Sequence, residues 1–266
     1  EPDQNVLDNG YDIELEFNGS LRENQQQPVQ AFLTSCKSGP LIEKSNGGII
    51  SLPCGGGKTI VALYLISKLK KKTIIVVHKE FLMNQWKERI KTFLPDARVG
   101  TIQASTIDIE NKDIVICMLQ SISMKEYKKD QFDSFGFTIV DECHHISSEV
   151  FSRALPKLTS TYTLGLSATP KRQDGMTKVF LWFLGPMLFK GEANKKKCID
   201  IKVVEYKNFD TDYCKEEVTR GGQLCYPRMI NNITNYERRT LLIIELIRRL
   251  INQNKKILIL SDRRNH

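Results

Sequence analysis

Three short polar segments carry the side chains that could do chemistry. The first, PCGGGKT (53–59), places three consecutive glycines before a lysine and a threonine. Glycines let backbone N–H groups approach a phosphate, the lysine can reach the β- and γ-phosphates, and the threonine hydroxyl can bind Mg²⁺. The segment therefore predicts a phosphate-binding loop that feeds a helix N-terminus.

The loop departs from the usual G-x-x-x-x-G-K-[ST] pattern, because Leu52 stands where that pattern has its first glycine. A glycine-rich turn before an ordinary helix is the alternative. It explains the glycines but not a Lys-Thr pair directly after an apolar strand. We therefore expect this loop to bind the phosphates of a nucleotide, and its expected ligands are Cys54, Gly55, Gly56, Gly57, Lys58 and Thr59.

The second segment, DECHH (141–145), follows a run of β-branched residues. A carboxylate at the end of such a strand can hold Mg²⁺, which predicts a metal-binding role for Asp141 together with Thr59. Glu142 would point the other way on the pleat, where it could orient and deprotonate a water molecule. A solvent-facing charge pair is the alternative, and the glycine-rich loop earlier in the chain favours the catalytic interpretation.

The third segment is SATP (167–170). Adjacent histidines rarely bind one metal because their side chains diverge. We therefore expect His144 and its neighbour His145 to form hydrogen bonds that link their loop to the SATP segment.

The elements that must position these segments alternate between strands and helices. Strands that are apolar along their whole length are typical of a parallel sheet covered on both faces, so the fold class is α/β. The three polar segments would then converge at the carboxyl edge of one sheet. The expected strands are 47–52, 73–78, 113–119, 137–142 and 162–168, and the expected helices are 58–69, 81–94 and 149–158.

Beyond residue 190 the pattern starts again. Residues 191–197 are polar and read as a linker, and they precede an expected strand (198–206), a long amphipathic helix (237–254) and a second strand (255–262). This order predicts the opening β–α–β unit of a second α/β domain. We expect an N-terminal extension over 1–20, a first domain over 21–190, and a linker with the beginning of a second domain over 191–266.

Composition sets broader limits. The 266 residues are 41% hydrophobic and 26% charged, enough for one large domain or two ordinary ones. The chain lacks an apolar run long enough for a membrane span and lacks a signal-peptide layout. Seven scattered cysteines without a C-x-x-C spacing favour reduced thiols in an intracellular protein over a zinc site, and do not distinguish nucleus from cytoplasm.

The net charge is +8, with lysine clusters at 68–72, 125–129 and 195–197. Each cluster is compatible with a solvated surface, and together they are compatible with a polyanion partner such as nucleic acid. Trp86, Trp182 and Phe151 stand among apolar residues at helical spacing, and we expect all three in the core.

The order GGGKT, DECH, SAT resembles the motifs of superfamily 2 helicases and translocases. Cys143 stands where the DEAH spelling has alanine. PCGGGK and SATPKRQDG (167–175) are similar to spellings of the XPB-like, UvsW-like and type III restriction branch, whose loop lacks the first glycine. Abundant Lys, Ile and Asn suggest an AT-rich genome, such as that of a virus encoding a transcript-release helicase.

The resemblance implies ATP hydrolysis, with Mg²⁺, coupled to 3′→5′ movement on DNA by two RecA-like domains. LRENQ (21–25) would recognise adenine through Gln25 beside Arg22, and MLQSI (118–122) resembles the segment that lines the nucleic-acid track in this family. Nucleic-acid contacts are expected from Gln120, Ser121 and Arg172. Coupling between nucleotide and nucleic acid is expected from His144, Ser167, Ala168 and Thr169.

The resemblance also implies a second motor domain with arginine fingers downstream of His266, so weak hydrolysis is expected of this chain alone. Alternatives are translocation on duplex DNA without unwinding, an RNA helicase, or a nucleotide-gated nucleic-acid-binding module. Transcription and repair machinery are candidate partners, and no membrane partner is expected.

Overall fold

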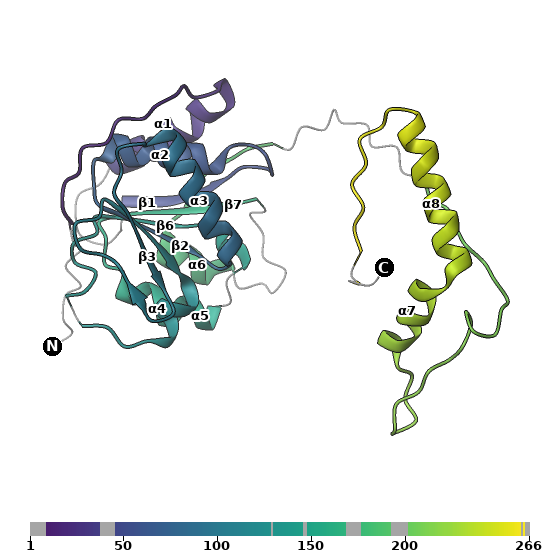
Figure 1. Cartoon of the computed structure of the whole chain (residues 1–266). Helices are drawn as coiled ribbons and strands as arrows, with labels where there is room; N and C mark the ends of the chain where they lie inside the picture. The colour runs from purple at the N-terminus through teal and green to yellow at the C-terminus, as the bar shows by residue number, and fades with distance from the viewer. Residues whose placement is uncertain are drawn as a thin grey trace. The chain divides into compact units, whose positions relative to one another are not determined.

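The computed structural model divides the chain into two compact units, Glu1–Lys196 and Lys197–His266 (Figure 1). The units are described separately below. The structure describes residues 9–37, 46–128, 130–145, 148–168, 177–192, 202–261 and 263.

The first unit is built on an eight-stranded sheet with the order β4-β3-β5-β2-β6-β7-β1-β8. Every neighbouring pair is parallel except β3 and β4, which are antiparallel. The predicted α/β class is therefore confirmed. The strands are β1 (Asn46–Ser51), β2 (Thr73–Val77), β3 (Val99–Gln103), β4 (Thr106–Ile107), β5 (Ile114–Met118), β6 (Phe137–Val140), β7 (Tyr162–Ser167) and β8 (Met187–Lys190).

The five predicted strands of the first unit form the centre of the sheet, where continuous apolar runs are buried on both faces. Strands β3, β4 and β8 were not predicted from the sequence. They lie toward the two edges: β3 alternates between buried and half-buried residues, β4 is exposed, and β8 is half-buried up to its exposed last residue. A short, partly exposed strand lacks the long apolar run that reveals a central one.

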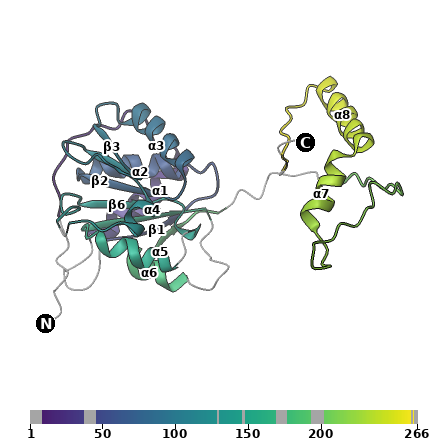
Figure 2. The same cartoon turned by 60° about the horizontal axis from the view of Figure 1, so that its bottom comes forward.

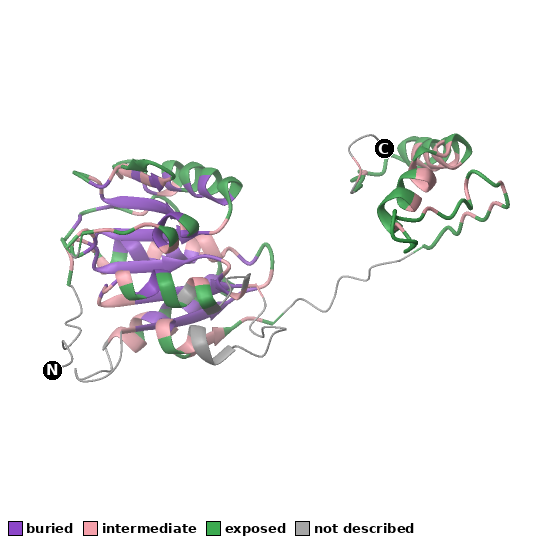
Figure 3. Ribbon diagram, turned by 90° about the horizontal axis from the view of Figure 1, so that it is seen from below, coloured by how far each residue is buried: buried purple, intermediate pink, exposed green. Residues whose placement is uncertain are grey.

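Helices cover both faces of this sheet (Figures 1 and 2). Side chains of α1, α2 and α3 share one apolar cluster with the sheet, and those of α4, α5 and α6 share the other. The buried sheet lies between exposed outer helix surfaces (Figure 3). The helices are α1 (Glu23–Lys37), α2 (Lys58–Leu69), α3 (Glu80–Phe93), α4 (Leu119–Met124), α5 (Ser148–Ala154) and α6 (Thr177–Leu184), with short 3₁₀ turns at Cys143–His145 and Leu155–Lys157.

An N-terminal segment, residues 9–20, runs along this unit. It makes an isolated bridge between Asp12 and Lys71, and Ile13 N donates a hydrogen bond to Lys70 O over 2.9 Å. Ile13 and Leu15 are buried, whereas Glu14 between them is exposed. The alternating sequence thus packs one of its faces into the first apolar cluster.

The second unit contains α7 (Tyr226–Asn235) and α8 (Glu237–Asn252), and α8 matches the helix predicted there. The two predicted strands are wrong over their described parts, because residues 202–206 and 255–261 form no strand. An isolated β–α–β unit has no neighbouring strands to satisfy its backbone groups and no second layer to bury its apolar face. None of the described residues of this unit is buried.

No helix in the described part of the chain is both long and apolar enough to cross a bilayer.

Candidate nucleotide-binding site

The loop between β1 and α2 has the backbone of an anion cradle. Gly55 and Gly57 have φ angles of 78° and 84°, in the left-handed region where a side chain is strained. A Cβ added to Gly55 would meet nothing within 4 Å, so the loop is open on that side. Gly57 is the N-cap of α2 and no side chain caps this helix end, which leaves its first N–H groups available to a phosphate.

Leu52, the residue that breaks the usual loop pattern, is an apolar anchor. It is buried, and its N–H donates to Ser167 O over 3.0 Å. The start of the phosphate loop is thereby tied to the carboxyl end of β7. Thr59 lies in the first turn of α2 and is half-buried, whereas Cys54 is exposed.

Gln25 joins α1 to this loop. Its Oε1 accepts a hydrogen bond from Arg22 N over 2.8 Å, while Gln25 N donates to Arg22 O over 2.9 Å. The first bond is one half of a capping box, in which a side chain in the first helical turn accepts from the N–H before the helix, and the second is a backbone turn. A Cβ on Gly57 would lie 2.0 Å from Gln25 Nε2, so the buried amide is pressed against the glycine loop. The Arg22 side chain is exposed, and adenine recognition by either residue stays a prediction.

The two carboxylates follow β6, which ends at Val140. Glu142 is not on the pleat, contrary to the geometry expected from the sequence: it has a φ of 47° in a turn beyond the strand. A non-glycine residue in this region is strained, and such residues cluster at functional sites. The turn aims Glu142 at the phosphate loop, where its Oε1 lies 2.6 Å from Lys58 Nζ.

Asp141 is held from both sides. Its Oδ2 accepts a hydrogen bond from Trp86 Nε1 over 2.8 Å, and its Oδ1 accepts one from Glu142 N over 2.9 Å. Burial raises the pKa of Asp141 above its usual value, and the hydrogen bond from the Trp86 indole opposes that rise. Burial likewise raises the pKa of the neighbouring Cys143 thiol to about 12, which makes it an inert small core residue.

A short polar chain leads from Glu142 to β7. His144 Nδ1 lies 3.4 Å from Glu142 Oε2 and 3.0 Å from Ser167 Oγ. The DECHH loop and the start of the SATP segment are therefore in contact. Whether this contact couples nucleotide to nucleic acid stays a prediction, as it does for Ala168, and Thr169 and Arg172 lie outside the described residues.

The proposed nucleic-acid residues lie at the start of α4. Gln120 is exposed, and its Nε2 donates to His78 O over 3.3 Å. Ser121 is buried, and its Oγ accepts a hydrogen bond from Ala104 N over 3.1 Å. In this structure Ser121 thus stabilises the loop after β3, and its contact with a nucleic-acid strand stays a prediction.

The two tryptophans differ from each other. Trp86 is 1% exposed, as expected of a core residue, but its N–H reaches the site, a role that apolar spacing did not predict. The available signal was chemical, because a buried indole N–H needs an acceptor. Trp182 is 79% exposed, so its expected place in the core is wrong. It lies on the short helix α6, and the helical spacing of apolar residues placed it on the buried face when it is on the exposed one. The Phe151 side chain lies outside the described structure.

The residues at this edge fit a magnesium ion. Asp141 offers a buried carboxylate, and Glu142 Oε2 is a buried oxygen that accepts no hydrogen bond from the described residues, although His144 Nδ1 lies 3.4 Å away. Oxygen ligands are the ones Mg²⁺ prefers. Thr59 and Asp141 would hold it.

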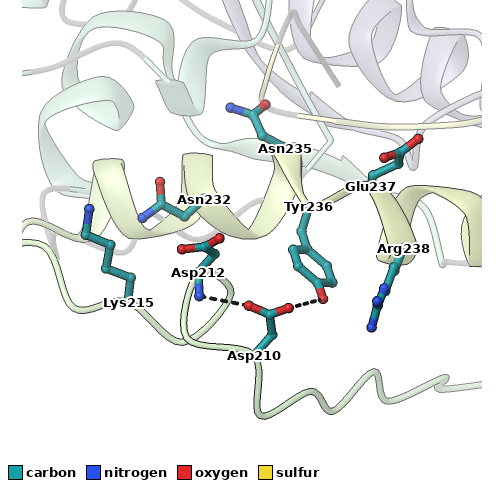
Figure 4. Close-up of a pocket in the computed structure, with 8 residues that line it drawn as sticks. All are labelled: Asp210, Asp212, Lys215, Asn232, Asn235, Tyr236, Glu237 and Arg238. Carbon is teal, nitrogen blue, oxygen red and sulfur yellow. Dashed lines mark hydrogen bonds between the residues drawn. The ribbon is translucent and has the colours of Figure 1, made fainter.

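A hollow with a volume of about 480 Å³ lies in the unit Lys197–His266 (Figure 4). Tyr236 Oη donates to Asp210 Oδ2 over 2.9 Å, and Asp212 N donates to Asp210 Oδ1 over 3.0 Å. Both carboxylate oxygens of Asp210 thus accept hydrogen bonds from this unit, and the hollow is lined by acidic and basic side chains together. This hollow offers no phosphate cradle. Its lining residues are Asp210, Asp212, Lys215, Asn232, Asn235, Tyr236, Glu237 and Arg238.

The first unit therefore has the fold and the loop of a RecA-like P-loop domain. Residues 18–172 match the family described as type III restriction enzyme, res subunit. The chain belongs to this family, within the XPB-like and type III restriction-like branch of superfamily 2 helicases.

Relatives of the chain carry helicase and translocase names. A protein of Acanthamoeba polyphaga mimivirus, whose assigned name is that of an ATP-dependent RNA helicase, is 34% identical over 99% of this chain and 50% of its own length. The DNA 3'-5' translocase XPB2 of Sulfurisphaera tokodaii is 34% identical over 71% of this chain and 40% of its own. The chain spans about half the length of the curated relatives it matches.

Solved structures share the fold. The UvsW helicase from bacteriophage T4 is 20% identical, with a TM-score of 0.51 over 67% of this chain and 64% of that chain. The SWI2/SNF2 ATPase core domain of Sulfolobus solfataricus is 18% identical, with a TM-score of 0.53 over 68% of this chain and 40% of that chain.

Proposed function

We propose that this chain is the ATP-binding part of a superfamily 2 motor that couples ATP hydrolysis to 3′→5′ movement on DNA. The observation that carries the proposal is the convergence of Lys58, Asp141 and Glu142 at one sheet edge. Lys58 Nζ and Glu142 Oε1 are separated by 84 positions in the sequence and by 2.6 Å in space. A phosphate-binding lysine beside a carboxylate base is the arrangement that nucleotide hydrolysis needs.

Each side chain has a defined task in this proposal. The glycine loop and Lys58 bind the phosphates, and Glu142 accepts a proton from the attacking water. Thr59 and Asp141 would hold Mg²⁺, which would supply positive charge to neutralise the phosphates. Gln25 abuts the glycine loop, where it would recognise the adenine base together with Arg22.

The Lys58–Glu142 ion pair must open before hydrolysis. While Lys58 contacts Glu142, the carboxylate competes with a γ-phosphate for the ammonium group, and the ammonium group occupies one carboxylate oxygen. An incoming triphosphate competes for Lys58 through its larger negative charge. Binding of ATP would therefore release Glu142 for proton transfer.

Coupling to nucleic acid would run through the contact of His144 with Ser167. Gln120 is exposed near the carboxyl edge and would contact the strand without reading its sequence. With a net charge of +8, binding should tolerate many sequences and weaken as salt rises. The name of the archaeal relative, a DNA 3'-5' translocase, supports DNA and this polarity.

Two neighbouring functions are kept as alternatives. The name of the mimivirus relative favours RNA as the track, and the name of the archaeal relative favours translocation without strand separation. Transcription or repair machinery would be the partner of either motor. A second motor domain beyond His266 would complete the site.

The test uses Lys58→Ala and Glu142→Gln in the full-length protein. Lys58→Ala should abolish measurable ATP binding by calorimetry. Glu142→Gln should keep binding and lower DNA-stimulated turnover about 100-fold or more. Unchanged turnover in Glu142→Gln would rule out this base. Stimulation by single-stranded RNA but not by DNA would assign the track to RNA, and turnover without opening of a 3′-tailed duplex would indicate translocation alone.

A further inference from the structure

The Trp86 indole lies against the candidate metal ligand although it comes from a different element. Trp86 is on α3, which follows β2, while Asp141 follows β6, the neighbour of β2 in the sheet. Trp86 Nε1 donates to Asp141 Oδ2 over 2.8 Å, and both residues are buried, at 1% and 5% exposure. The contact is therefore shielded from water. A hydrogen bond to a carboxylate is strong in such a shielded environment.

The Asp141 carboxylate is held at both ends. Glu142 N donates to Oδ1 and the indole donates to Oδ2, so rotation of the carboxylate would break one bond or the other. Each carboxylate oxygen has two acceptor positions, so one position on each oxygen remains for a metal or its bound water. Groups that orient a metal ligand in this way set metal affinity although they do not touch the metal.

We infer that Trp86 is a positioning residue that fixes the Asp141 carboxylate for Mg²⁺-nucleotide and so sets the magnesium affinity of the site. The inference rests on the proposed function, because it takes Asp141 as the magnesium ligand. The competing explanation is that Asp141 merely satisfies a buried indole N–H. The two explanations predict different results when the hydrogen bond is removed. If Asp141 only satisfies the indole N–H, the protein loses stability, whereas if the indole positions the carboxylate, the site also loses affinity for Mg²⁺.

The first experiment removes the N–H and keeps an aromatic ring. Trp86→Phe in the full chain should lower the affinity of the ADP-bound site for Mg²⁺ by about 10-fold to 100-fold. Calorimetric titration of ADP at a series of Mg²⁺ concentrations measures this affinity. ADP affinity in EDTA should change less than about twofold, because the indole donates to Asp141 and not to the phosphate loop.

The matched control is Ile90→Ala. Ile90 is on the same helix, is also 1% exposed and belongs to the same apolar cluster, but it has no polar group. It should lower the melting temperature and leave the magnesium response unchanged. If Ile90→Ala and Trp86→Phe lower the Mg²⁺ affinity equally, the inference is wrong. It is also wrong if Trp86→Phe leaves the Mg²⁺ affinity unchanged.

The second experiment reads the contact directly. The chain has two tryptophans, so Trp182→Phe, at an exposed position, leaves Trp86 as the single fluorescent indole. Mg²⁺ added to the ADP complex should change its emission, and Asp141→Asn should remove that change. A response that persists in Asp141→Asn, or no response in the parent, would overturn the inference.

The outcomes separate the two proposals. If the parent chain binds no Mg²⁺-ADP, the proposed function fails and this inference falls with it. If the parent binds Mg²⁺-ADP and Trp86→Phe binds it equally well, the proposed function stands and only the positioning role is lost.

Discussion

At the residue scale, the site combines strain with an internal ion pair. Glu142 has a left-handed backbone that an L side chain rarely adopts, and its carboxylate contacts Lys58 from a segment 84 positions away. The attraction between these charges compensates for the strain of the turn in the protein without nucleotide. In the proposed mechanism ATP would take Lys58 and remove that compensation, so the turn would be held less firmly at the hydrolysis step.

The two left-handed glycines of the phosphate loop should differ when replaced. Gly57→Ala adds a Cβ 2.0 Å from Gln25 Nε2 as well as backbone strain, whereas Gly55→Ala adds strain alone. We expect Gly55→Ala to cost about 1–2 kcal/mol of unfolding free energy and Gly57→Ala to cost more. Urea denaturation measures the difference, and ADP titration should show the larger loss of affinity for Gly57→Ala. Equal losses of unfolding free energy would mean that the Gln25 side chain moves away from the added Cβ without destabilising the protein.

At the element scale, the N-terminal segment behaves as part of the first unit. Its alternating residues place Ile13 and Leu15 in the apolar cluster beneath α2 and α3, while Phe17 stacks on Phe93 at 5.5 Å. A segment that supplies core side chains stabilises the unit even though, among the described residues, its bridge is to Lys71, which precedes β2, and not to a strand of the sheet.

Leu15→Ala should lower the unfolding free energy by about 2–4 kcal/mol, because it removes buried apolar volume. Glu14→Ala is the matched neighbour: its side chain is exposed, and its ion pair with Lys70 spans 3.8 Å at the surface. It should change stability by less than about 0.5 kcal/mol. Chemical denaturation of both variants is the measurement, and equal effects would show that the segment is not packed.

A bidentate pair connects the starts of β3 and β5. Asp113 accepts hydrogen bonds from Arg98 N, Nε and Nη2 at 2.8, 3.0 and 2.6 Å. Burial alone would raise the pKa of Asp113, but the bonds from Arg98 outweigh it, so the pKa lies below its usual value. A carboxyl group with a lowered folded-state pKa contributes stability above its unfolded pKa, and that contribution is lost as the pH falls through the folded value.

Asp113→Asn should therefore lower stability by about 1–2 kcal/mol at pH 7, and the difference from the parent should shrink below about pH 4. Urea unfolding at pH 7, 5, 4 and 3 measures this profile. If the difference in unfolding free energy stays constant across the pH series, the pair stabilises the protein by packing and not by the charge of Asp113.

At the scale of the whole molecule, the two units differ in how much they bury. The sheet of the first unit is covered on both faces, whereas none of the described residues of the second unit is buried. Several large apolar side chains on and after α8 are exposed, among them Leu241, Leu258 and Leu260. This unit has little apolar burial to oppose local opening.

Backbone amides of α8 should consequently exchange with solvent about 100-fold faster, or more, than those of β2 and β6. Hydrogen exchange followed by mass spectrometry would measure both regions in one experiment. Similar protection in the two regions would show that α8 is buried in solution by contacts that this structure does not contain.

The sequence by itself determined the α/β class, the central strands, the phosphate loop and the carboxylate pair, because apolar periodicity and the glycine–lysine–threonine order are local properties. Only the tertiary structure decided that Glu142 leaves the pleat to contact Lys58, that Gln25 abuts Gly57 and that Trp86 holds Asp141. Those contacts join segments from 32 to 84 positions apart. No local pattern encodes them, because they depend on which strands become neighbours and on how each chain segment turns as it leaves the sheet.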